Sequence, residues 1–214
     1  MRLIDKYQPK DWPDIIGNAK AVAKLRGIVE RPGFSGDAFA IVGPSGCGKS
    51  TLADVVAGMF CEPWNIHKLD GHDCNVDAVR DVRDALAYTA MASEAKPMRA
   101  WIINEHHGMT AMAVQAWLTT LDHLPLNTLF FFTTTEDTTD LFGQFSRPFS
   151  GRLKEIGLTN QGLVEAYAIF LQRVARAEGL DGQELPAYIR YVKDNRNDLR
   201  RCLQGIDAGD MVAA

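Results

Sequence analysis

The fold of this chain is decided by the stretch Gly43-Pro44-Ser45-Gly46-Cys47-Gly48-Lys49-Ser50. It fits the phosphate-loop pattern G-x-x-x-x-G-K-[ST], in which glycines let the backbone turn tightly so that successive N–H groups face an anion. An apolar run at residues 38–42 precedes the stretch, and a helix-like run at residues 51–60 follows it. Because strand, loop and helix occur in the required order, a phosphate site at the helix N-terminus is favoured over a chance match of a glycine-rich turn.

Two side chains of this loop suit a nucleotide. Lys49 can reach the outer phosphates, and the Ser50 hydroxyl can ligate Mg²⁺. The sequence therefore predicts that ATP or ADP binds here together with Mg²⁺. The residues expected to hold the nucleotide are Gly43, Pro44, Ser45, Gly46, Cys47, Gly48, Lys49, Ser50 and Thr51.

The bulk properties exclude some classes of protein. The chain has 214 residues and a formal net charge of −4. Without an overall basic charge, any contact with nucleic acid must come from a local patch. No apolar stretch reaches the length of a membrane span, and the first residues lack an apolar signal core. We expect a cytoplasmic protein.

The cysteines do not form a recognisable framework. Cys47, Cys61, Cys74 and Cys202 show no C-x-x-C spacing, so a disulfide scaffold is not expected. A zinc site built from Cys61, Cys74 and the histidines between them, His67 and His72, is the alternative. Its spacing is irregular, so separate buried thiols are favoured.

Apolar strands alternate with helical segments over most of the chain, which predicts an α/β fold. Strands are expected at residues 38–42, 65–69, 100–103, 129–134 and 153–158, and helices at 19–29, 49–60, 76–89 and 111–121. Segments of these lengths predict a five-stranded parallel sheet covered by helices on both faces.

The pattern changes at Thr159, after which no strand-like run occurs. Thr159 is a candidate N-cap for a helix that reaches Glu178 and stops at Gly179. Residues 186–194 and 198–207 read as two further helices. The sequence thus predicts an α/β nucleotide-binding core at residues 1–158 and a small all-helical lid at residues 159–214.

Polar residues follow two of the predicted strands, where ligands bind to parallel sheets. Glu105 can orient an attacking water, although an exposed loop acid is the alternative. Asn104 stands where an acid supporting Mg²⁺ is expected, and its neutral amide supports a hydrated metal less strongly. The hydroxyls of residues 133–135 can contact the water or the γ-phosphate, or can reflect only the strand propensity of threonine.

With these residues in place, the chain resembles the AAA+ ATPases of the clamp-loader group, which includes the bacterial DNA polymerase III gamma/tau subunit and the replication factor C small subunit. The similarity covers nearly the whole chain and rests on motifs in a fixed order. They are Lys6-Tyr7-Gln8-Pro9-Lys10 with Asp14-Ile15-Ile16-Gly17, Leu69-Asp70-Gly71 with Val76-Asp77-Ala78-Val79-Arg80, Asn104-Glu105-His106-His107, Gln115-Ala116-Trp117-Leu118-Thr119-Thr120-Leu121-Asp122, Thr133-Thr134-Thr135-Glu136, and Asn197-Asp198-Leu199-Arg200-Arg201-Cys202-Leu203.

The resemblance implies a role for each motif. ATP and Mg²⁺ would lie between a P-loop NTPase core and the lid, with Mg²⁺ held by Ser50 and, through water, by Asn104. Thr135 would be the sensor-1 residue, and Arg200 the sensor-2 arginine on the lid. The opening motif would lie against the adenine through Tyr7, Pro9, Ile15 and Ile16.

The chain departs from the family pattern in several places. Asn104 replaces the first acid of the Walker B motif, which bears on hydrolysis more than on binding. The Ser-Arg-Cys motif that supplies an arginine finger to a neighbouring subunit is not intact: Arg147 keeps the Ser-Arg pair, while Arg152 keeps the spacing to the fifth strand and is favoured. The zinc-binding cysteine cluster of gamma/tau is absent, and the chain ends with the lid, so the family's collar domain is expected to be lacking.

These features support an ATPase that acts on DNA or a sliding clamp as one subunit of a homo- or hetero-oligomer of AAA+ proteins. Two alternatives stay open: a nucleotide-binding scaffold or switch with little hydrolysis, and an AAA+ loader or remodeller of another replication protein. Arg80 and Arg83 are candidates for contact with the DNA backbone, but they alternate with acids as in an ordinary solvated helix face.

Overall fold

A five-stranded parallel sheet forms the centre of the molecule. The computed structural model describes residues 1–88, 91–135 and 151–212. Within them the strands are β1 (Gly36–Val42), β2 (Cys61–Asp70), β3 (Met98–Asn104), β4 (Thr128–Thr134) and β5 (Lys154–Gly157), in the spatial order β2-β3-β4-β1-β5. All the paired strands run parallel, so their carboxyl ends meet at one edge of the sheet. This confirms the predicted α/β class.

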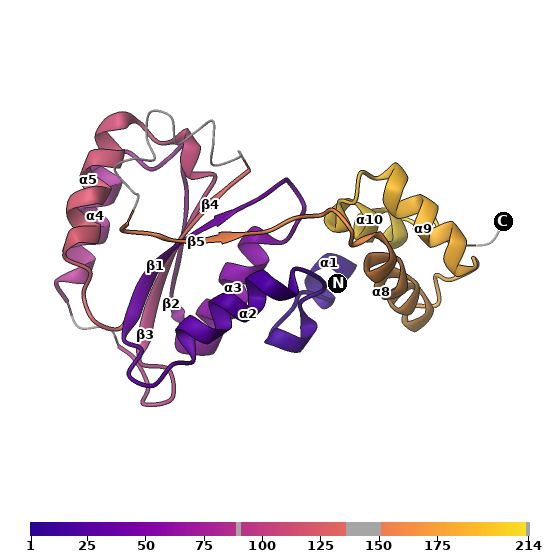
Figure 1. Cartoon of the computed structure of the whole chain (residues 1–214), viewed down its shortest axis with the longest axis horizontal. Coiled ribbons are helices and arrows are strands. Elements are labelled where there is room, and N and C mark those ends of the chain that lie inside the picture. Colours follow the sequence, from indigo (N-terminus) through magenta and orange to yellow (C-terminus); the bar gives the residue numbers. More distant parts are fainter. Residues whose placement is uncertain (89–90, 136–150, 213–214) are drawn as a thin grey trace.

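Helices cover both faces of the sheet, as Figure 1 shows. On one face, α2 (Ala19–Val29) and α3 (Lys49–Phe60) pack in a core with Phe39, Ile41 and Phe131 of the sheet. On the other, α4 (Val76–Leu86) and α5 (Ala111–Asp122) pack against the strand residues that point the opposite way. The central strands are apolar and buried on both sides because each face has its own layer of helices.

The C-terminal helices form a separate cluster beside the core (Figure 1). The cluster contains α8 (Val164–Ala177), α9 (Leu185–Asp194) and α10 (Leu199–Asp207), with its own buried core. The short α1 (Leu3–Lys6) also belongs to it, because Leu3 is buried among the lid side chains. The predicted division of the chain at residue 158 stays a prediction, but the first turn of the chain packs with the lid.

A polar clasp joins the segment after α1 to the end of α8. Tyr7 donates its hydroxyl to Glu178 Oε1 at 2.5 Å, and Lys6 Nζ lies 2.7 Å from the same oxygen. Both contacts lower the pKa of Glu178, that with Lys6 more than that with Tyr7. The clasp fixes Tyr7 at the edge of the lid.

The predicted N-cap at Thr159 is wrong, because α8 begins only at Val164. The Thr159 backbone instead forms two hydrogen bonds with the Asn18 side chain. Its N–H donates to Asn18 Oδ1 at 2.8 Å, and its carbonyl accepts from Asn18 Nδ2 at 3.0 Å. A contact 141 residues away in sequence therefore ties this stretch between core and lid to the start of α2.

The helix predicted at residues 76–89 is also shorter than expected. It ends at Leu86, because the buried Arg99 guanidinium donates to the carbonyls of Ala85, Leu86 and Tyr88 at 2.8–2.9 Å. Burial lowers the pKa of Arg99, and the three carbonyls compensate by accepting its N–H groups. Arg99 of β3 thus caps the end of α4.

Candidate functional site

The phosphate loop connects β1 to α3 at the carboxyl edge of the sheet. Gly46 and Gly48 have φ values of 74° and 95°, which side chains with a Cβ rarely adopt. No side chain caps the first turn of α3, whose N-cap is Gly48. The amides at this helix end therefore remain available for an anion.

Lys49 lies inside the loop and is only 6% exposed. Its ammonium donates to the carbonyls of Gly43 at 2.9 Å and Pro44 at 3.0 Å. Burial lowers the pKa of Lys49, and among the described residues no carboxylate lies within ion-pair distance of it. A desolvated cation with only carbonyl partners favours binding of a phosphate.

Ser50 and Asn104 meet at the base of the loop. The Ser50 hydroxyl donates to Asn104 Oδ1 at 2.7 Å, and the Thr133 hydroxyl donates to the same oxygen at 3.2 Å. Oxygen donors of this kind suit Mg²⁺, which usually keeps several waters and takes further oxygens from phosphates. Because the pair is uncharged, it fits a Mg²⁺ ion whose charge is balanced by the nucleotide.

Glu105 follows Asn104 in a left-handed conformation, with φ 51° and ψ 49°. Its backbone N–H donates to Thr133 Oγ1 at 3.3 Å, which ties this turn to the end of β4. Thr135 donates its hydroxyl to Glu105 Oε2 at 3.1 Å. The predicted water-orienting acid and the predicted sensor residue are thus in direct contact.

A cavity of about 480 Å³ opens between the core and the lid above the phosphate loop. The predicted residues that line it come from three parts of the chain, the N-terminal segment, the loop with β3, and the lid. They are Tyr7, Pro9, Ile15, Ile16, Ser45, Gly46, Cys47, Gly48, Lys49, Ser50, Thr51, Glu105 and Arg200. Gly43 and Pro44 lie behind Lys49 as its acceptors, and Asn104 and Thr135 lie behind Ser50 and Glu105.

The lid contributes lining residues that the sequence analysis missed. Tyr167 and Phe170 of α8 face the cavity, together with Leu199, Leu203 and Gln204 of α10. Phe170 packs edge-on against Tyr7, with ring centroids 6.4 Å apart. Burial raises the pKa of Tyr167 to about 12, so its hydroxyl stays neutral. The spacing of two aromatic residues three apart on one helix was the available signal.

The lid also lies directly on the phosphate loop. The Asp198 carboxylate caps α10 by accepting from the N–H of Arg201 at 3.0 Å. The same carboxylate lies against Gly46, where an added Cβ would overlap it. A movement of α10 would therefore change the contact between Asp198 and the phosphate loop at Gly46.

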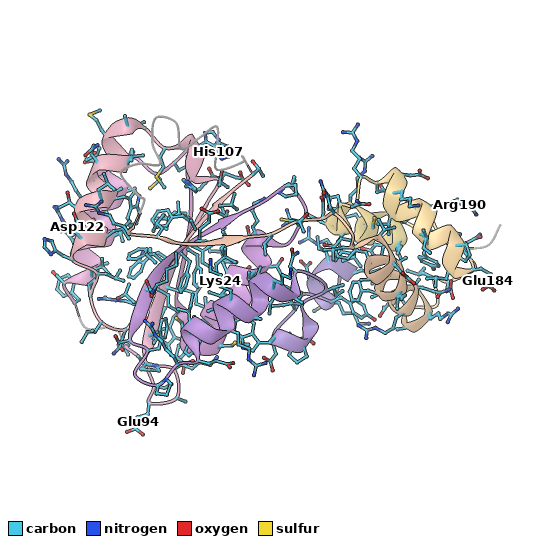
Figure 2. The ribbon with its side chains drawn as sticks, viewed as in Figure 1. Lys24, Glu94, His107, Asp122, Glu184 and Arg190 are labelled. Carbon is cyan, nitrogen blue, oxygen red and sulfur yellow. The ribbon has the colours of Figure 1, made fainter. Side chains whose placement is uncertain are left out.

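Other predicted residues lie away from the cavity. Arg152 pairs with Asp122 at the C-terminal end of α5, with Nε 2.6 Å and Nη2 3.0 Å from the two carboxylate oxygens. Figure 2 places Asp122 on the side of the core opposite the lid, so Arg152 does not serve this chain's own cavity. Arg147 and Glu136 lie outside the described residues. Arg80 pairs with Asp77 at 2.8 Å on the exposed face of α4, as in a solvated helix, and Arg83 is exposed there too.

The zinc alternative finds no support in the structure. Cys61, Cys74 and the two other cysteines are free and buried. In the part of the chain that is described, no group of three or more His, Cys, Asp or Glu side chains is arranged to hold a metal ion. Cys74 instead accepts a hydrogen bond from Trp117 Nε1 at 3.2 Å within the core.

Comparisons with known proteins agree with this geometry. A family model described as "ABC transporter" matches residues 34–146, the phosphate loop and the sheet around it, which P-loop NTPases share. The chain is 28% identical over 131 residues to the replication factor C small subunit of Haloarcula marismortui, covering 59% of this chain and 39% of that protein. It is 28% identical over 153 residues to the DNA polymerase III subunit tau of Bacillus subtilis, covering 61% and 26%. The chain belongs to the AAA+ P-loop NTPases, and the relatives that it resembles are clamp-loader subunits.

Solved structures support the AAA+ fold independently. The Thermotoga maritima RuvB Holliday junction branch migration motor superimposes with a TM-score of 0.72 at 19% identity, over 94% of this chain and 64% of that one. At this identity the likeness concerns the fold alone. The chain spans about a quarter to two fifths of the clamp-loader relatives and just under two thirds of RuvB. Among the described residues, no helix of this AAA+ protein is long and apolar enough to cross a membrane.

Proposed function

We propose that this AAA+ protein binds ATP with Mg²⁺ between core and lid, hydrolyses it, and uses the cycle to act on DNA, a sliding clamp or another replication partner in the cytoplasm. One observation carries this proposal: the core–lid cavity brings a buried lysine, a hydroxyl–amide oxygen pair and a carboxylate to one edge of the sheet. The resemblance to clamp-loader subunits supports the choice of partner.

Each residue would have a distinct task in this site. Lys49 and the loop amides would bind phosphates, and Ser50 with Asn104 would hold hydrated Mg²⁺, which adds positive charge at the phosphates. Glu105 would orient the attacking water from its contact with Thr135. The adenine would lie among Tyr7, Pro9, Ile15 and Ile16. Arg200 would contact the γ-phosphate from the lid, so that the position of the lid depends on the bound nucleotide.

The experiment that tests this function is steady-state ATP hydrolysis by the purified protein, alone, with primed DNA, and with primed DNA plus a sliding clamp. A rate that rises with DNA, and further with the clamp, supports a clamp-loader activity. A rate that stays the same when DNA is added favours a remodeller of another protein. ATP binding without turnover would contradict the hydrolysis and favour the alternative that follows.

Asn104 is the observation that favours a second candidate, a nucleotide-gated scaffold or switch with little hydrolysis. Its Oδ1 accepts from Ser50 and Thr133 as a carboxylate would, but without negative charge. Such a protein would change the position of its lid when ATP binds and would leave hydrolysis to a partner subunit.

Replacing Asn104 by aspartate separates these candidates. In Asn104→Asp the two hydroxyl donors keep their acceptor and the site gains a charge for the hydrated metal. We expect half-maximal hydrolysis at an about tenfold lower Mg²⁺ concentration, with a higher maximal rate. The measurement is ATP turnover across a Mg²⁺ titration, with Asn104→Ala as the control that loses the acceptor. A variant that binds ATP yet shows neither gain would disprove the limiting role of metal support.

Arg152 is proposed to complete the site of a neighbouring subunit, as an arginine finger does. Its bidentate pair with Asp122 holds the guanidinium at the core surface, 35% exposed. Because the finger and the phosphate loop then belong to different chains, Arg152→Ala and Lys49→Ala proteins should each be inactive alone but recover part of the hydrolysis when mixed. Turnover of these mixtures is the measurement, with Arg147→Ala tested in parallel. Arg152→Ala protein that hydrolyses ATP at the wild-type rate would eliminate this residue as the finger.

A further inference from the structure

The turn after β3 folds back so that His107 stands beside Glu105. It is a single 3₁₀ turn, η2 (His106–Gly108), closed by a hydrogen bond of 2.9 Å from the Gly108 N–H to the Glu105 carbonyl. The left-handed conformation of Glu105 starts this turn. A non-glycine residue in that conformation is uncommon, and here it brings two side chains that are two positions apart into contact.

His107 contacts the carboxylate of Glu105 and the end of β4 with one ring nitrogen. Its Nδ1 lies 3.4 Å from Glu105 Oε2 and 3.1 Å from Thr134 Oγ1. The Thr135 hydroxyl donates to the same Oε2 at 3.1 Å. Nδ1 forms its hydrogen bond with the Thr134 hydroxyl, and the Glu105 carboxylate lies just beyond it, where it attracts an Nδ1 that carries the hydrogen because a carboxylate only accepts hydrogen bonds.

A second imidazole lies against the His107 ring. His72, in the turn between β2 and α4, meets it edge-on with ring centroids 6.2 Å apart and planes at 83°. The two turns approach closely because Gly108 leaves the space that His72 fills and Gly71 leaves the space that the Glu105 carbonyl fills. Figure 2 shows His107 at this edge of the core.

The neighbouring histidine has a different environment. His106 Nδ1 lies 3.1 Å from the Thr133 carbonyl and holds the turn to β4. Burial lowers the pKa of His106 to about 4, so its ring stays neutral at physiological pH. His106 therefore secures the backbone, whereas His107 is aimed at the carboxylate.

We propose that His107 is a positioning residue for hydrolysis: with Thr135 it holds Glu105 Oε2, so that Oε1 is presented to the attacking water in the cavity. Among the described residues, Thr135 and His107 both contact this carboxylate at Oε2, and Glu105 itself lines the cavity. Fixing one oxygen restricts the rotation of the carboxylate and orients the other. The inference rests on the proposed function, in which Glu105 orients the water.

The test compares two replacements of His107 that differ in where they place an N–H group. In His107→Asn, the side-chain amide nitrogen occupies the position of Nδ1, while His107→Ala has no donor. We expect His107→Ala to lower kcat by about tenfold with ATP affinity and melting temperature close to wild type, and His107→Asn to keep most of the rate. In a Glu105→Gln background, His107→Ala should cause no further loss of kcat, because both substitutions act through the Glu105 carboxylate.

The controls separate a positioning role from a structural one. His72→Ala removes the ring that supports His107 without touching Glu105, so it should lower kcat less than His107→Ala. Equal losses for His107→Ala in the wild-type and Glu105→Gln backgrounds, or a falling melting temperature with no rescue by asparagine, would overturn the inference. A normal kcat in His107→Ala would overturn the positioning role of His107 but leave the proposed hydrolysis standing. A wild-type protein that binds ATP without turnover would overturn both the hydrolysis and the role of His107.

Discussion

Replacing Lys49 by alanine should strongly weaken nucleotide binding and abolish ATP hydrolysis. The ammonium is buried and desolvated, and within the described part of the chain its hydrogen-bond partners are the carbonyls of Gly43 and Pro44. A bound phosphate would give it an anionic partner, so loss of this pair should weaken ATP affinity by about 100- to 1,000-fold. The measurement is the melting temperature of wild-type and Lys49→Ala proteins over a range of ATP and ADP concentrations, because a ligand that binds only the folded state raises it.

The matched control is Lys20→Ala, which removes an exposed lysine of α2. It should leave the nucleotide-dependent rise in melting temperature unchanged. Without nucleotide, Lys49→Ala should melt close to wild type, because the mutation also removes a buried charge. If Lys49→Ala retained the full rise with ATP, the anion site would have to lie elsewhere in the cavity.

Replacing Glu105 by glutamine should separate binding from chemistry. The amide oxygen of glutamine can still accept from the Thr135 hydroxyl, so the geometry at the end of β4 should survive. The side chain can no longer draw a proton from water, and we expect a fall in kcat of about 100- to 1,000-fold with ATP affinity almost unchanged. Single-turnover hydrolysis and equilibrium ATP binding measure the two quantities separately.

Glu94→Gln serves as the control for the loss of one negative charge. Glu94 is exposed, in a loop far from His107 in Figure 2, and its replacement should not change either quantity. A Glu105→Gln protein that turned over ATP at the wild-type rate would show that another group orients the water. Loss of binding instead of rate would assign Glu105 to nucleotide affinity.

Local patterns predicted the core of this fold closely. The helices at Ala19–Val29 and Lys49–Phe60 have the bounds that the sequence indicated, because apolar spacing and the phosphate loop define them without help from distant residues. The five strands were found for the same reason, although β2 begins at Cys61 rather than at residue 65. Contacts distant in sequence account for the errors: Arg99 ends α4, and Asn18 holds Thr159 out of a helix.

The residues of the candidate site were likewise predicted where local patterns define them and missed where distant contacts do. Motif spacing found Lys49, Ser50 and Glu105, whose positions follow from where strands end. It did not find Tyr167 or Phe170, because helical spacing identifies a buried face without showing whether a core or a cavity covers it. Nor did it show that His107 would turn back onto Glu105, since that depends on a left-handed residue that no local pattern specifies.

The packing of α1 among the lid helices makes the α/β core an insertion within the helical unit. The chain starts beside α10, where the Leu3 N–H lies 3.4 Å from Asp207 Oδ2, then builds the whole sheet before it returns to that unit at α8. Separate expression of residues 159–212 would therefore uncover the apolar surface that Leu3, Tyr7 and Ile16 now shield. The lid and the core should therefore melt in one cooperative transition.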